Sequence, residues 1–315
     1  MTTNSSGAPM PATRAPSPPM PAAPLPATPA ADGSPITDVN TLQLVDAAVA
    51  AQIKSAAGYS GTPGVSREEM MAMPAEAPAA AAADKPGSER WPVKTGQDQD
   101  RAKVGKNVIN GENLGAGIVP TTIDELISLP RPPGLQVATQ DPPQFKSVRD
   151  GVTEVTIWTL QATITALKHE ADGDYHLVLQ SKSGVEMVAE IPTPTTQFVG
   201  DSPWLNNIKQ ARQAVDTTLV GKLSPAAFTL VNDKYLPQQS LASTDAAAAA
   251  PAPAGMSFTT PEEGSGLTQP LFATRISPTA VQITGVGFFD RAHGATGAAP
   301  NVIELHPVLK VVFSA

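Results

Sequence analysis

The chain contains no cysteine among its 315 residues, and it is poor in aromatic and charged residues. Without cysteine it cannot form a disulfide, a zinc site built on thiolates or a cysteine nucleophile. Aromatic side chains make up 4% of the residues and charged side chains 16%, and much of the 41% apolar fraction is alanine. Because alanine buries little surface, the sequence carries less core material than its apolar fraction indicates, and less folded mass than its length would allow.

Long apolar runs are also missing. No stretch of about 18 apolar residues occurs, so no membrane-spanning helix is expected. The N-terminus shows no basic segment followed by an apolar one, so no signal peptide is expected. The formal net charge is −8, and from residue 150 onward nine basic residues stand against fifteen acidic ones. An acidic domain repels a polyanion, so nucleic acid is not expected as a partner.

Proline, by contrast, is abundant and concentrated near the N-terminus. Residues 1–35 contain ten prolines among alanine, serine and threonine. Such a composition buries too little apolar surface to offset the entropy of ordering, so residues 1–90 are predicted to be a disordered leader. Within this leader, residues 38–58 could form a short helix with one apolar stripe. An isolated helix of that length is marginal in water.

Residues 91–150 are predicted to form an extended linker. Its one helix is predicted over 122–129, where Thr122 at the N-cap and Glu125 three residues later form a capping box. Trp91 sits in this linker and could dock on the folded part of the chain.

The folded domain is predicted over residues 151–315. Alternation of apolar and polar residues indicates five strands, over 152–169, 174–181, 185–191, 281–289 and 302–313. Between the third and fourth strands a helix opens near Pro203 and ends at Gly221. Residues 225–279 follow it and are rich in proline, alanine and glycine in places, so they are interpreted as a long flexible insertion.

The order of these elements predicts the fold. Three strands, a helix and two strands follow one another as in the OB-fold, a five-stranded Greek-key barrel. The predicted fold class is therefore all-β with one helix: an OB-like five-stranded Greek-key barrel (β-β-β-α-β-β) after a long disordered N-terminal region. Gly285 and Gly287 in the fourth strand suit a bend at a barrel corner. The alternative is a five-stranded open sheet packed on one helix.

Side chains able to bind a metal or transfer a proton occur at the ends of the predicted strands. Alternate residues of a strand share a face, which places Asp174 with His176 and Glu304 with His306. The candidate site comprises Asp174, His176, Glu190, Asp290, His293, Glu304 and His306. Imidazole beside carboxylate is the ligand set of a divalent metal such as zinc or manganese, and the candidate ligands are His176, His293, His306 and Asp174.

The same residues are also compatible with two other roles. Histidine and carboxylate side chains at strand ends can hold loops through hydrogen bonds. They could also act without a metal as general acids and bases, because histidine titrates near neutrality. No phosphate-binding loop, serine nucleophile elbow or HExxH motif is present. Whether the pairs converge depends on strand register, which one sequence does not set.

Five stretches of the chain, about half of it, resemble a family of mostly uncharacterised, usually exported bacterial proteins. They are RWPVKTGQDQD at 90–100, PTTIDELISLPRP at 120–132, residues 152–194 with DYHLVL, SPWLNNIKQAR at 202–212, and residues 281–309 with GFFDRAHGATGAAPNVIELHPVL. The last has the pattern GFFDxxHGxTGxAPNxIELHPVL, which is long and unusual. The resemblance implies an OB-like domain and an exported or envelope location, and it implies no established activity.

These observations predict a non-enzymatic binding or interaction module carried on a flexible tether, with a protein or a small ligand as its partner. The alternative is a metal-dependent, nuclease-like hydrolase, in which the histidine and carboxylate residues at the barrel hold a metal that activates water.

Overall fold

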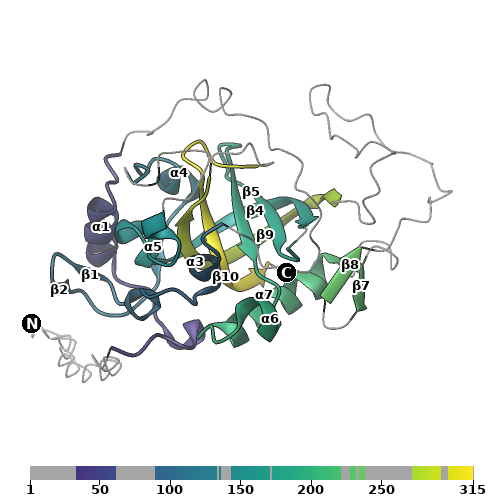
Figure 1. The fold of residues 1–315 in the computed structure, drawn as a ribbon. Coiled ribbons are helices and arrows are strands. Elements are labelled where there is room, and N and C mark those ends of the chain that lie inside the picture. The colour runs from purple at the N-terminus through teal and green to yellow at the C-terminus, as the bar shows by residue number, and fades with distance from the viewer. Residues whose placement is uncertain are drawn as a thin grey trace, which may run out of the picture.

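The structure is a computed structural model that describes residues 33–61, 89–132, 135, 143–170, 172–220, 228–231, 234–237, 272–291 and 297–314. At its centre is a barrel of five strands: β4 (Ile157–His169), β5 (Tyr175–Gln180), β6 (Glu186–Ile191), β9 (Phe272–Phe289) and β10 (Ile303–Phe313). In Figure 1 the barrel lies between α1, β1 and β2 on one side and the β7–β8 hairpin on the other.

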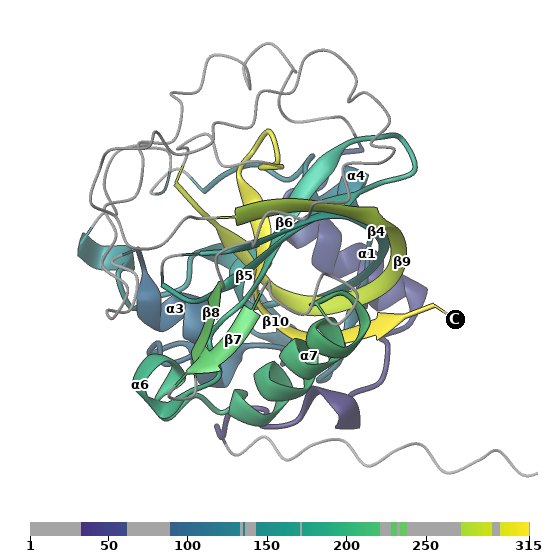
Figure 2. The same cartoon turned by 90° about the vertical axis from the view of Figure 1, so that its right-hand side faces the viewer.

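The barrel is closed and has mixed strand directions. Its strands are hydrogen-bonded in the order β4-β5-β6-β10-β9, and pairing of β4 with β9 completes the ring (Figure 2). The contact between β6 and β10 is parallel, and the other contacts in the ring are antiparallel. This is the strand order of an OB-like Greek-key barrel. The predicted fold class is therefore confirmed, and the open-sheet alternative is wrong.

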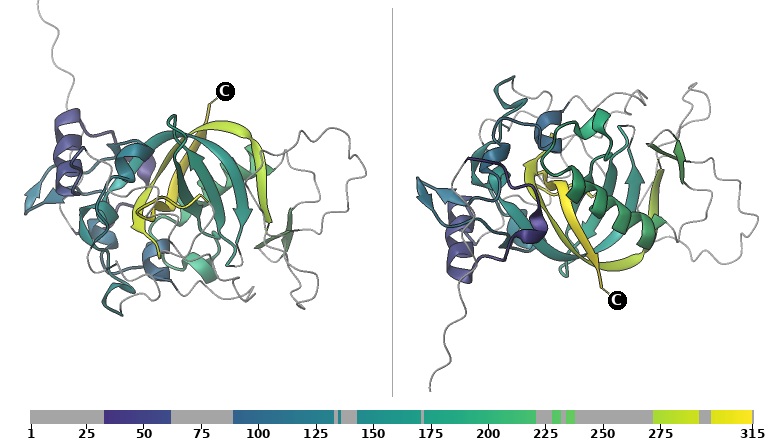
Figure 3. Two further views of the ribbon diagram at one scale, coloured as in Figure 1. Left: turned by 90° about the horizontal axis from the view of Figure 1, so that it is seen from above. Right: turned by 90° about the horizontal axis from the view of Figure 1, so that it is seen from below.

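Helix α7 (Leu205–Thr218) lies between β6 and β9 in the chain and follows the short helix α6 (Thr196–Val199). Figure 3 shows α7 lying across the barrel. It packs on β10 with the apolar stripe predicted for it: Trp204, Ile208, Ala211, Val215 and Leu219, all buried. Among the helices in the described ranges, none has the length and apolar character that crossing a membrane requires.

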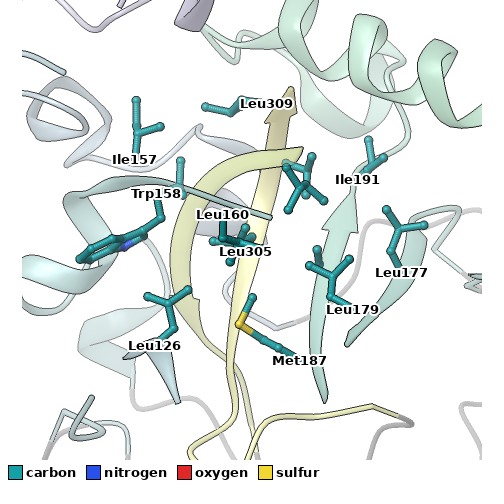
Figure 4. Packing of buried hydrophobic residues seen from close by; sticks show 14 of the residues in the cluster. Leu126, Ile157, Trp158, Leu160, Leu177, Leu179, Met187, Ile191, Leu305 and Leu309 are labelled. Atoms are coloured by element: carbon teal, nitrogen blue, oxygen red, sulfur yellow. The ribbon is translucent and has the colours of Figure 1, made fainter. Parts of the chain in front are cut away.

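Alternate residues of each strand fill the barrel. Leu177 and Leu179 of β5, Met187 and Ile191 of β6, and Leu305 of β10 belong to one core cluster (Figure 4). Because side chains alternate across a strand, the residues between them lie on the outer face of the barrel wall.

Strand β4 begins later than predicted, and the set of alternate residues that faces the core changes along its length. Gly151–Val155 forms helix α5, so the strand starts at Ile157. A register shift between Ile164 and Ala166 marks a bulge. An inserted residue exchanges the two faces of a strand, and Leu167 rather than Ala166 therefore belongs to the core cluster.

The expected flexible insertion, 225–279, is partly strand. Strand β9 starts at Phe272, so residues 272–279 lie within it, and its first part pairs with the end of β4. Phe228–Val231 (β7) and Lys234–Pro237 (β8) form an antiparallel hairpin within the same range. The rest of the expected insertion lies outside the described residues.

The segments before the barrel also carry structure, where the sequence predicted a disordered leader and an extended linker. They contain η1 (Val39–Thr41), α1 (Ala47–Ala56), α3 (Trp91–Thr95), η2 (Arg101–Lys103), β1 (Val108–Ile109), β2 (Glu112–Asn113), β3 (Val119–Pro120), α4 (Ile123–Leu126) and η4 (Pro143–Phe145). Strand β3 pairs with β4 in parallel and adds a sixth strand to the sheet. Residues 1–32 and 62–88 lie outside the described part of the chain.

Apolar side chains spaced along these segments explain their packing. Val39, Ile53, Val93, Val104 and Ile123 are each at most 1% exposed. Each such side chain contributes roughly 1.5–3 kcal/mol when it leaves water, which offsets the entropy of ordering its segment. These residues are therefore part of the folded body, in contrast to the predicted leader and linker.

Three local features of these segments were predicted. The capping box of Thr122 and Glu125 forms at the start of α4, as predicted. Trp91 docks as expected, and its indole N–H donates to a backbone carbonyl of α6 at 2.9 Å. The helix expected over 38–58 is limited to α1, because Asp46 caps it by accepting a hydrogen bond from the backbone N–H of Val49.

Gly287 in β9 allows α5 to approach the barrel closely. A Cβ at this position would overlap the carbonyl oxygen of Thr153 and lie 2.8 Å from Nε1 of Trp158. We expect Gly287→Ala to lower the free energy of unfolding by about 1–3 kcal/mol in urea titrations, since the backbone of α5 must move. Gln282→Ala, at an exposed position of the same strand, is the control and should change the free energy of unfolding by less than about 0.5 kcal/mol. Equal losses for the two variants would contradict the steric explanation.

Candidate functional site

Two strand registers bring the predicted histidines together on the outer face of the barrel wall. His176 of β5 lies opposite Glu190 of β6. The parallel pairing of Glu304 with Val188 continues so that His306 of β10 falls beside Glu190. Residues adjacent to these in the chain fill the interior, so the polar side chains share the opposite face.

Glu190 is at the centre of this group. Its Oε1 lies 2.9 Å from Nδ1 of His176, and its Oε2 lies 2.9 Å from Nδ1 of His306. Oε1 of Glu304 lies 3.1 Å from the same His306 nitrogen, and Oδ2 of Asp174 lies 3.4 Å from His306 Nε2. We call Asp174, His176, Glu190, Glu304 and His306 the polar cluster.

Three further charged residues border the polar cluster. Oε1 of Glu170 lies 3.3 Å from Nδ1 of His176. The ammonium group of Lys94, from α3, lies 3.7 Å from Glu190 Oε2 and 3.7 Å from Oδ1 of Asp290. The cluster therefore joins three barrel strands to α3.

The polar cluster is buried. Its five residues are between 0% and 6% exposed. The ring of Phe288 contacts His306 edge-on, with 5.8 Å between ring centroids, and Lys94 Nζ lies 5.3 Å from the centre of that ring. A pocket next to the cluster, lined in part by Val188 and Glu304, has room for no more than about one water molecule. In the described part of the chain, these side chains therefore present almost no surface to solvent.

Hydrogen bonds and charges determine the protonation of the cluster. Burial opposes the charged form of His176, but its hydrogen bonds with Glu170 and Glu190 outweigh this and raise its pKa well above the ordinary value. The pKa of His306 is also raised despite burial, mainly by the charge of Glu190. The pKa of Glu190 is lowered despite burial, mainly by Lys94. These shifts favour the charged forms of His176, His306 and Glu190, which lie in contact with one another.

One carboxyl group is poised near neutrality. Burial raises the pKa of Glu304 to about 7, and the charges of Glu190 and Asp290 act in the same direction. A group with such a pKa can exchange a proton at physiological pH. Catalysis would also require a substrate within hydrogen-bonding distance, and the burial of Glu304 makes the described arrangement better suited to a structural role.

The structure brings together some of the site residues predicted from sequence and not others. It brings together Asp174, His176, Glu190, Glu304 and His306, whereas Asp290 lies at the edge of the group, with its Oδ1 3.7 Å from the ammonium of Lys94. His293 lies outside the described residues. Lys94 and Glu170 contact the cluster but were missed from sequence. For Lys94 the only signal was a basic residue near the apolar Trp91 and Val93, and nothing in the sequence paired it with the strands.

A second buried ion network holds α3 in place over the polar cluster. The guanidinium of Arg90 forms two 2.7 Å hydrogen bonds with the carboxylate of Glu154. Arg149 forms a similar pair with Asp98, at 2.9 and 3.1 Å. It also donates to the backbone carbonyl of Val93, within α3. Both pairs therefore join α3 and its flanking residues to the segment that leads into the barrel.

His169 is a buried histidine at the end of β4, outside the polar cluster. Burial lowers its pKa to about 3, and the charge of Arg212 adds to this effect. The folded protein thus binds this proton less readily than the unfolded chain, so stability falls as the pH drops from about 6.5 toward 3. Between pH 7 and pH 5, the protonation of this group lowers the free energy of unfolding by about 2 kcal/mol.

We expect His169→Gln to remove this component of the pH dependence. Urea titrations at pH 7 and pH 5 give the free energy of unfolding of the wild type and of the variant. Between these pH values the free energy of unfolding should fall by about 2 kcal/mol less in the variant than in the wild type. The same pH dependence in both proteins would show that His169 is not held neutral in the fold.

Comparison of the chain with protein-family models, with curated proteins and with solved structures gave no match. The family resemblance noted in the sequence stays a prediction, and the function of the chain has to be inferred from its own residues.

Proposed function

We propose that this chain is a non-enzymatic interaction module, in which the histidine and carboxylate residues stabilise the barrel rather than act on a substrate. The observation that carries this proposal is the burial of the polar cluster, whose five residues are at most 6% exposed. A general acid, base or nucleophile has to reach the substrate, and these side chains are covered by α3 and Phe288.

The position of α3 also supports this proposal. OB-fold proteins that bind oligonucleotides or oligosaccharides use the face of their second and third strands, which correspond to β5 and β6 here. In this chain the outer face of β5 and β6 carries His176 and Glu190, and Lys94 of α3 packs on Glu190. Together with the acidic charge of the C-terminal half, this disfavours nucleic acid as the ligand. The partner of the module is then a protein or a small ligand that binds elsewhere on the surface.

The tether in this proposal is inferred from the amino-acid composition of the N-terminal residues. Residues 1–32 contain nine prolines, which is typical of a segment that separates a domain from its anchor. Residues 33–61 pack on the folded body and are not part of the tether.

The second candidate is the metal-dependent hydrolase. The observation that favours it is the group Asp174, Glu190 and His306, which can each offer one ligand atom within 4.8 Å of the others. A metal held there could activate water, provided that residues outside the described part leave a path to it.

Two assays distinguish these candidates. The full chain, purified without an affinity tag, is incubated with zinc or manganese and with bis-(4-nitrophenyl) phosphate and 4-nitrophenyl acetate. A fluorescent single-stranded oligonucleotide is titrated in parallel at physiological salt. We expect no turnover above the metal blank and no anisotropy change. Metal-dependent turnover that His306→Gln abolishes would overturn the proposal in favour of the hydrolase.

The positive test uses affinity capture of a partner from the source cells by the full chain. A specific partner should be retained equally by the wild type and by His306→Gln, provided that the variant is folded, because the polar cluster is not part of the contact surface. Loss of the partner with a folded His306→Gln variant would show that the cluster belongs to the binding site.

A further inference from the structure

Two buried polar atoms of the polar cluster lie near each other without a hydrogen-bond partner. Oδ2 of Asp174 and Nε2 of His306 face each other as a long ion pair of 3.4 Å, and among the described residues neither atom takes part in a hydrogen bond of good geometry. The two residues are 1% and 0% exposed. A buried polar group without a good hydrogen bond costs about 1–3 kcal/mol, so a ligand that contacts both atoms would stabilise this arrangement.

The remaining polar atoms of both side chains are already held in place. Oδ1 of Asp174 accepts a hydrogen bond from the backbone N–H of Thr193 at 3.0 Å. Nδ1 of His306 lies between Glu190 and Glu304, at 2.9 and 3.1 Å. A carboxylate on one ring nitrogen is the usual support of a metal-binding histidine, because it orients the ring and directs the second nitrogen toward the ion.

The separation of the two atoms fits a metal ion better than a direct contact. A charged hydrogen bond between nitrogen and oxygen is typically about 2.7–2.9 Å long, which is shorter than the observed 3.4 Å. Two ligand atoms of a tetrahedral zinc ion, each at about 2.0–2.1 Å from the metal, lie about 3.3–3.4 Å apart. The distance is therefore that of two neighbouring ligands of one ion.

Additional carboxylates favour a cation at this point. Glu190 offers a third ligand atom within 4.8 Å of those of Asp174 and His306. Asp172 lies beside Asp174, since its Oδ1 accepts a hydrogen bond from the Asp174 backbone N–H at 3.2 Å. A divalent ion would offset the charge repulsion among these acidic groups.

A second grouping of possible ligands, Glu170, His176 and Glu190, shares one member with the first. Its histidine already uses Nδ1 for a 2.9 Å hydrogen bond with Glu190. That grouping is therefore satisfied by its own hydrogen bonds, which distinguishes it from the pair of Asp174 and His306.

We propose that Asp174 and His306, with Glu190 as the third ligand within reach, bind one divalent transition-metal ion, and that this ion is zinc. The ion takes the place of the proton on Nε2 of His306, and that proton is released to solvent when the metal binds. The ion joins the start of β5 to β10 and has a structural role. This inference goes beyond the interaction-module proposal and does not depend on it, since a structural ion is compatible with any partner.

The test uses the full chain without an affinity tag. The protein is stripped with EDTA, dialysed, incubated with zinc and desalted, and its metal content and melting temperature are measured. We expect about one zinc per chain and a higher melting temperature, because an ion that binds only the folded state stabilises it. Wild-type protein that retains no zinc, with an unchanged melting temperature, would overturn the proposal.

Isosteric variants assign the ligands. Asp174→Asn and His306→Gln should retain at least tenfold less zinc than the wild type, whereas His169→Gln, which removes a buried histidine outside the polar cluster, should retain as much. Zinc retained equally by all three variants would overturn the assignment to Asp174 and His306.

A measurement on the wild type covers the case in which the ligand variants fail to fold. Cobalt(II) in a tetrahedral nitrogen and oxygen site absorbs visible light much more strongly than octahedral cobalt(II) in water. We expect the stripped protein to give this absorption with one equivalent of cobalt, and zinc to abolish it. A spectrum identical to that of aqueous cobalt would contradict the proposed site.

Discussion

Glu154→Ala is expected to lower the free energy of unfolding by about 3–5 kcal/mol. The side chain of Glu154 is 0% exposed, and its two oxygens accept hydrogen bonds from Arg90 at 2.7 Å each. Oε1 also accepts a 3.0 Å hydrogen bond from the backbone N–H of Phe289. The variant would leave the Arg90 guanidinium buried without its carboxylate, and removal of one partner from a buried ion pair is strongly destabilising. Because this pair holds α3, the barrel wall beneath α3 should also become more accessible.

Urea titrations followed by tryptophan fluorescence measure this loss. Asp201→Ala is the control, since the ion pair of Asp201 with Arg101 spans 3.8 Å and Asp201 is 76% exposed. An exposed pair contributes less than about 1 kcal/mol. The double variant Arg90→Met, Glu154→Met should be more stable than Glu154→Ala, because it buries no unpaired charge. A Glu154→Ala protein within about 1 kcal/mol of the wild type would show that α3 is held by other contacts.

Glu190→Ala is expected to have an effect of similar size, about 3–5 kcal/mol. Glu190 is the carboxylate that lies 2.9 Å from each of the two buried histidines and 3.7 Å from Lys94. Removal of this one negative charge leaves His176 and His306 with fewer counter-charges in a buried environment. Titrations in the presence of EDTA isolate the contribution of the ion network from that of any bound metal.

Two further variants test the electrostatic explanation of the Glu190 result. Glu112→Ala removes a carboxylate from the exposed strand β2 and should change the free energy of unfolding by less than about 0.5 kcal/mol. Lys94→Met in the Glu190→Ala background should recover part of the loss, because it removes one cation from the cluster. If Lys94→Met adds its own full destabilisation instead, the loss in Glu190→Ala comes from packing rather than from charge.

Local patterns in the sequence were sufficient to predict the barrel. Period-two alternation located β5, β6 and β10 within one or two residues, and the order of strands and helix predicted the OB-like connectivity. The Thr122–Glu125 capping box and the apolar stripe of α7 were also visible, because each depends on residues a few positions apart. The limits of β4 were predicted less well, since the bulge at Thr165 and the helix α5 depend on contacts with other elements.

The packing of the N-terminal segments was decided by tertiary structure. Val39 and Ile53 lie in the alanine-rich stretch 38–58, whose apolar stripe predicted a short helix but gave no indication of the partner on which it packs. Val39 donates its backbone N–H to Asn207 of α7, and α1, which carries Ile53, contacts β3. Contacts between segments so far apart in the sequence leave no local signal.

The sequence by itself therefore determined the strands, their order and the chemical character of the candidate residues. Only the tertiary structure decided that five of those residues meet and that they meet beneath α3. The physical reason is strand register: shifting one strand by a single residue would move His306 and Glu304 to the barrel interior and abolish the cluster. That register results from packing of the whole barrel, and no residue near His306 in the chain sets it alone.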